Sequence, residues 1–127
     1  MSLLILSAKA LGTIIGYTVN LEAIRAAKKG IGALLDESES LDGLDAAIEY
    51  LENSEFDAGI KELKKYCKNN ERSQGYRVVK ELYAGELEEI HNKVAGIINN
   101  GSVMARGPAY QINTQTNQLI SELKALP

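Results

Sequence analysis

Apolar side chains recur at spacings of three and four residues along almost the whole chain of 127 residues. This spacing places them on one face of an α-helix, whereas a half-buried β-strand alternates apolar and polar residues. The chain contains no convincing alternating run. The sequence therefore predicts an all-α protein, a bundle of four to five helices that forms a single domain over residues 1–127.

The residues at the ends of the apolar stripes indicate where each helix begins and ends. Asparagine and glycine after a stripe are typical of helix ends, and Pro108 suits a first helical turn. Ser54 and Asp57 match a capping box, which predicts a helix that begins at Ser54. The expected helices span about residues 3–35, with a possible break near 30–32, and residues 41–53, 54–68, 76–99 and 109–126.

The second and third of these helices are joined by a very short connection, which predicts an antiparallel hairpin at about residues 41–68. An acidic row follows the apolar stripe of the first helix by one position, and lysines follow the stripe of the second helix in the same way. We therefore expect the two charged rows to face each other across the hairpin. The acidic row consists of Asp42, Asp45, Glu49 and Glu52, and the lysines are Lys61, Lys64 and Lys68.

The bases of this region also form a face that could hold phosphate or carboxylate groups. This basic face consists of Lys61, Lys64, Lys65, Lys68 and Arg72. The chain carries a net charge of −3, and the face lacks the interleaved aromatic residues of a nucleic-acid surface. We therefore expect no nucleic-acid partner, and interpret the basic face as a solvated surface that the acidic row partly neutralises.

The expected N-terminal helix is apolar on two neighbouring faces, more than a small bundle normally buries. A glycine pair spaced by three residues would let two such helices approach closely. We expect self-association through this segment, with Leu4, Leu11, Gly12, Ile15 and Gly16 as the contacts. A membrane-associated protein that uses residues 3–21 is an alternative, but the uncharged run over residues 10–21 is only twelve residues long. A membrane-spanning helix needs about 20 residues.

Side chains for metal binding or nucleophilic catalysis are scarce, because the chain contains one histidine and one cysteine. Glu88 and His91 have the spacing of one half of a di-iron site, but a helical bundle needs two such motifs and further carboxylates. A metal-binding bundle centred on these two residues remains an alternative. Cys67 falls on an apolar stripe, where a thiol packs as a small hydrophobic group. We predict no catalytic residue, no bound metal and no cofactor.

These observations favour a non-catalytic protein that binds another protein or itself, as an adaptor, an immunity or inhibitor protein, or a structural component. The single cysteine excludes an internal disulfide. No basic region precedes the apolar N-terminal run, as it would in a secretory signal. We therefore expect a cytoplasmic protein.

Overall fold

The computed structural model describes residues 11–12, 16–18, 20–34, 42–70, 74–101 and 103–127. These residues form helices and no strand, which confirms the predicted all-α bundle. The helices are α2 (Leu21–Leu34), α3 (Asp42–Glu52), α4 (Phe56–Asn70), α5 (Gln74–Asn100) and α6 (Val103–Lys124), and Leu11 and Gly12 are also helical.

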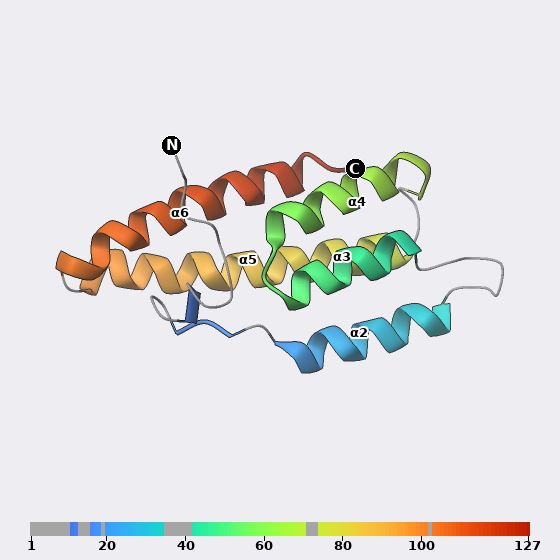
Figure 1. Cartoon of the computed structure of the whole chain (residues 1–127), viewed down its shortest axis with the longest axis horizontal. Coiled ribbons are helices and arrows are strands. Elements are labelled where there is room, and N and C mark those ends of the chain that lie inside the picture. Colours follow the sequence, from blue (N-terminus) through green and yellow to red (C-terminus); the bar gives the residue numbers. More distant parts are fainter. Residues whose placement is uncertain (1–10, 13–15, 19, 35–41, 71–73, 102) are drawn as a thin grey trace.

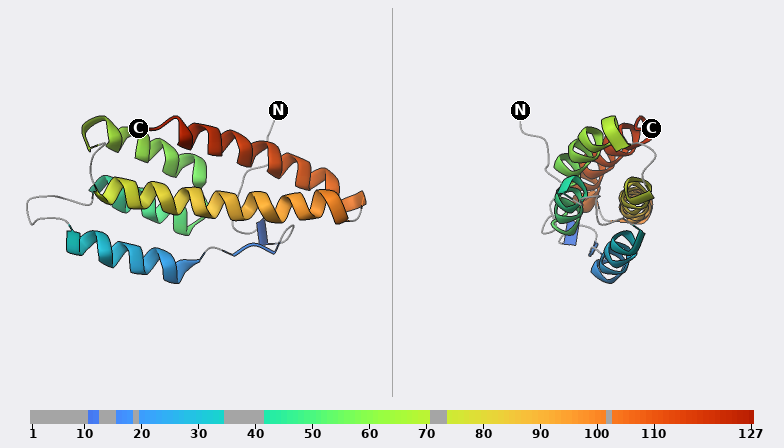
Figure 2. Two further views of the ribbon diagram at one scale, coloured as in Figure 1. Left: turned by 180° about the vertical axis from the view of Figure 1, so that it is seen from behind. Right: turned by 90° about the vertical axis from the view of Figure 1, so that its right-hand side faces the viewer.

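Helix α5 is the centre of the bundle and the one helix in the described part that contacts all the others. Helix α6 runs back along it, α2 lies against another side, and the hairpin of α3 and α4 covers a third (Figures 1 and 2). The apolar stripe of α5 explains the central position of this helix, because six large side chains along the stripe are fully buried. They are Tyr76, Val79, Tyr83, Leu87, Ile90 and Val94.

Tyr83 projects from α5 between the two helices of the hairpin. Its hydroxyl donates a hydrogen bond to the backbone carbonyl of Ala47 in α3, and its ring meets that of Phe56 edge-on at a centroid distance of 6.2 Å. Gly59 of α4 leaves room for this side chain, since a Cβ atom at that position would lie 2.5 Å from the Cζ of Tyr83. The antiparallel hairpin predicted at residues 41–68 is confirmed, and Tyr83 of α5 contacts both of its helices.

The predicted continuous helix over residues 3–35 is wrong at residues 16–18 and at Asn20, where the backbone is not helical. Gly16 adopts a left-handed φ of 66°, and its N–H donates to the carbonyl of Gly12 at 3.2 Å. Asn20 then caps α2, because its side-chain oxygen accepts a bond from the N–H of Ala23 at 3.1 Å. The break suggested near residues 30–32 is also wrong, since α2 runs through them, and residues 3–10 lie outside the described part.

The capping box predicted at Ser54 is wrong as well. Ser54 adopts a left-handed φ of 59° and ends α3: its N–H donates to Leu51 O at 3.0 Å, and the N–H of Glu55 donates to Tyr50 O at 2.8 Å. This pair of bonds is the Schellman arrangement that terminates helices. Helix α4 therefore begins at Phe56 rather than at Ser54.

Most of the other predicted helix bounds lie within two residues of the observed ones, but α6 begins six residues earlier than residue 109. Pro108 lies inside α6 rather than in its first turn. Proline there removes only one backbone bond, to the carbonyl four residues earlier. The helix starts directly after the turn at Gly101, whose N–H donates to Ile97 O at 2.7 Å.

Candidate binding surface

Asp45 of the acidic row pairs with α2, not with the lysines of α4. Helix α3 lies between α2 and α4 (Figure 1). The carboxylate of Asp45 is 3.6 Å from the ammonium group of Lys28 in α2. Among the described residues no ion pair joins α3 to α4. The expectation that the two charged rows face each other is therefore wrong.

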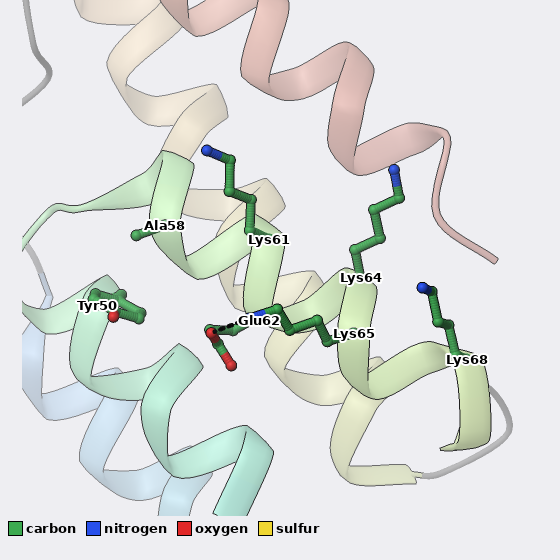
Figure 3. A pocket seen from close by; sticks show the side chains of 7 residues that line it. All are labelled: Tyr50, Ala58, Lys61, Glu62, Lys64, Lys65 and Lys68. Atoms are coloured by element: carbon green, nitrogen blue, oxygen red, sulfur yellow. Dashed lines mark hydrogen bonds and ion pairs between the residues drawn. The ribbon is translucent and has the colours of Figure 1, made fainter.

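The way in which α3 and α4 pack against each other explains why the two charged rows do not meet. The stripes of α3 and α4 both face α5, and the flanks that meet are formed by the residues that precede each stripe position. Ala47 and Gly59 are such residues, and both are buried around the hydroxyl of Tyr83. Further along the same flanks, Tyr50 lies opposite Glu62 (Figure 3). The residues that follow each stripe position, the charged rows, consequently face outward on opposite sides of the hairpin.

An open depression of about 390 Å³ lies beside this seam (Figure 3). One of its lining residues, Tyr50, comes from α3, and the others come from α4: Ala58, Lys61, Glu62, Lys64, Lys65 and Lys68. Four members of the predicted basic face therefore share one surface, and Arg72 lies outside the described residues. Four lysines and one glutamate give the lining a net charge of +3, on a chain whose net charge is −3.

The ion pairs on α4 leave two of these ammonium groups unpaired. Lys61 pairs with Asp57 one turn earlier at 3.6 Å, and Lys65 pairs with Glu62 at 3.4 Å. Lys64 and Lys68 are exposed and form no ion pair with any described residue. They stand one helical turn apart, about 6 Å along the axis. Figure 3 shows Lys61, Lys64 and Lys68 extending away from α3. This geometry suits an anionic group that approaches from solvent.

Of the residues predicted for an N-terminal interface, the three that the structure describes do not share one helix face. Leu11 is fully buried in the core. Gly12 and Gly16 are exposed, but Gly16 is not helical, so the pair cannot form a close-approach face on a single helix. Leu4 and Ile15 lie outside the described residues. An interface at this segment stays a prediction, and Leu11 is an unsuitable contact for it.

The residues weighed for chemistry are far from forming a cluster. Glu88 is exposed and His91 is half-buried on α5. Over the described ranges, no three histidine, cysteine, aspartate or glutamate side chains are grouped so that they could hold a metal ion. Cys67 is buried, as expected, and its thiol donates to the backbone carbonyl of Lys64 at 3.2 Å.

Sequence reasoning missed Glu86, a carboxylate that is only 7% exposed on α5. Burial raises the pKa of Glu86, and Glu89 raises it further, whereas a hydrogen bond from the backbone N–H of Asn20 opposes the shift. The segment around residues 16–20 packs here, with the ammonium group of Lys93 5.8 Å from the ring centroid of buried Tyr17. Positions 83, 86 and 90 have the three- and four-residue spacing of the apolar stripe. This spacing indicates that the side chain at position 86 faces inward.

Comparisons of the chain with protein-family models, with curated proteins and with solved structures find no match. Among the helices that the structure describes, none is long and apolar enough to cross a membrane. The function must therefore be argued from the helical bundle and from the chemistry of its surface.

Proposed function

We propose that the protein is a non-catalytic binding protein that docks an acidic segment of a partner protein on the basic face of α4. One observation carries this proposal: among the described residues the acidic row of α3 forms no ion pair with α4, and Lys64 and Lys68 have no ion-pair partner beside an open depression. Carboxylates are the groups on proteins that such ammonium pairs bind. An adaptor, an inhibitor or a structural component could use this contact.

A protein partner fits the charge distribution better than a nucleic acid does. The basic surface spans about two turns of one helix, and the chain as a whole is acidic. A phosphate backbone would extend beyond the lysines to surfaces that repel it, whereas a short acidic segment would not. The contact is expected to be weak and sensitive to salt, because exposed ion pairs contribute only about 0.2–1 kcal/mol each. A cytoplasmic location is proposed on the ground that Cys67 is a single buried thiol.

The test is a titration of the full chain with a fluorescently labelled, glutamate-rich peptide, followed by anisotropy at low and at physiological salt. The variant Lys64→Glu/Lys68→Glu is expected to weaken binding about tenfold or more, because two attractive pairs become repulsive. The matched control is Arg25→Glu/Lys29→Glu, which changes the net charge equally at exposed positions of α2, a helix that does not contact α4. The control is expected to retain binding.

Three outcomes would contradict the proposal. The first is the absence of binding by the unchanged protein at low salt. The second is an equal loss in the control variant, which would show that only the net charge matters. The third is tighter binding of a single-stranded oligonucleotide of equal charge, which would make a nucleic acid the better partner.

A further inference from the structure

We infer that the acidic segment bound at the basic face carries a large apolar side chain, which enters the depression between Tyr50 and Ala58. This inference rests on the proposed function and names the chemistry of its ligand. The observation behind the inference is that the side chains lining the depression next to α3 differ in chemistry from those at the end that faces solvent.

The end next to α3 presents two apolar groups beside the ion pair of Glu62 and Lys65. The ring of Tyr50 and the methyl group of Ala58 are both half-buried there, on facing helices (Figure 3). The methylene stems of the lysines continue this surface outward, since long charged side chains lie along apolar surface and keep only the charged group in water. The volume of about 390 Å³ is at the lower end of the range of sites that enclose organic groups.

A carboxylate is disfavoured at this same end. Glu62 lies there and already pairs with Lys65 at 3.4 Å, so that a second carboxylate would meet the negative charge of Glu62. At the other end, Lys64 and Lys68 are exposed and form no ion pair within the described part of the chain. The depression therefore separates an apolar subsite from a cationic one. A ligand that fills both has an apolar residue directly beside its carboxylates.

Two peptides test this inference, one glutamate-rich with a central phenylalanine and the other identical except for serine at that position. The phenylalanine peptide is expected to bind the unchanged protein about tenfold more tightly, because only it removes apolar surface from water. Tyr50→Ala is expected to remove most of this preference. Ala58→Gln covers the subsite without adding charge and is expected to remove the preference for the phenylalanine peptide as well. This second variant keeps the test valid if Tyr50→Ala fails to fold.

The variant Lys64→Glu/Lys68→Glu is expected to weaken both peptides equally and to keep their ratio. Equal affinity of the two peptides for the unchanged protein would overturn the inference and leave the proposed function intact. A preference that survives in both Tyr50→Ala and Ala58→Gln would place the apolar side chain elsewhere, and would also overturn the inference. Failure of both peptides to bind would instead overturn the proposed function itself.

Discussion

The contact between Gly59 and Tyr83 offers the sharpest test of how the bundle is held together. In Gly59→Ala, the new Cβ would fall on the hydroxyl oxygen of Tyr83 and within 2.5 Å of its Cζ. The ring cannot retreat without cost, because Tyr83 is fully buried and its hydroxyl bonds to the carbonyl of Ala47. The substitution therefore overpacks the contact between α4 and Tyr83, and the forced shift of the ring breaks that hydrogen bond.

The expected magnitude follows from these two costs and one gain. Overpacking of a core costs about 1–3 kcal/mol, and a buried polar group that loses its partner costs a further 1–3 kcal/mol or so. Alanine is the better helix former by about 1 kcal/mol, which offsets part of the loss. The free energy of unfolding should fall by roughly 3 kcal/mol, which lowers the unfolding temperature of a chain this size by about 10 °C.

Thermal and urea unfolding, followed by circular dichroism, measures this loss. Gly85→Ala is the matched control, because an added Cβ there meets nothing within 4 Å on an exposed face of α5. It should stabilise the protein by about 0.5–1 kcal/mol. In Gly59→Ala/Tyr83→Leu the loss should be less than the sum of the two single losses. If Gly59→Ala proves as harmless as Gly85→Ala, Tyr83 does not lie between the hairpin helices as described.

Further predictions concern Ser54, Glu86 and Leu11. Ser54→Gly should raise the free energy of unfolding by about 1 kcal/mol. It relieves the strain of a left-handed φ and removes a buried hydroxyl that has no partner among the described residues. Ser54→Ala should give only the part of this gain that comes from removing the hydroxyl. Because the pKa of Glu86 is raised above 4.5, the folded chain binds more protons than the unfolded chain between pH 4.5 and that raised value, and its stability falls as the pH rises through this window. Glu86→Gln should remove that slope in urea unfolding at several pH values and be the more stable variant at neutral pH; an unchanged slope would show that Glu86 is not its source. Leu11→Asp should lower the unfolding temperature equally at all protein concentrations, because Leu11 is fully buried, whereas a concentration-dependent effect would indicate a subunit interface.

The apolar spacing was sufficient to predict α3, α4 and α5, because the residues of their stripes are also the residues of the core. Ile48, Leu63 and Leu87 are examples, each almost completely buried. Helix formation there follows from local periodicity, and the packing partner only selects which face is covered. Cys67 was assigned to the core for the same reason.

The break before α2 could not be predicted from spacing. Tyr17 within the break and Ile24 after it keep the seven-residue repeat, and both are buried. The deciding feature is the left-handed backbone at Gly16, which periodicity does not encode. Ser54 illustrates the same limit, since a serine three residues before an acid is compatible with a helix start. The short connection instead uses this serine to end the preceding helix.

The spacing of apolar residues does not determine which neighbour the lysines of α4 face. Packing in the core determines it. When the apolar stripes of two helices both face a third helix, the two helices can meet along the residues that precede the stripe positions or along the residues that follow them. Charge complementarity favours the second arrangement. The observed hairpin instead joins the preceding flanks, where Ala47 and Gly59 are small enough to surround the hydroxyl of Tyr83. A buried hydrogen bond and tight packing outweigh exposed ion pairs, which contribute only about 0.2–1 kcal/mol each. The packing of Tyr83 therefore keeps the described acidic side chains of α3 away from Lys64 and Lys68, and the stability of the bundle and the proposed binding surface depend on the same contact.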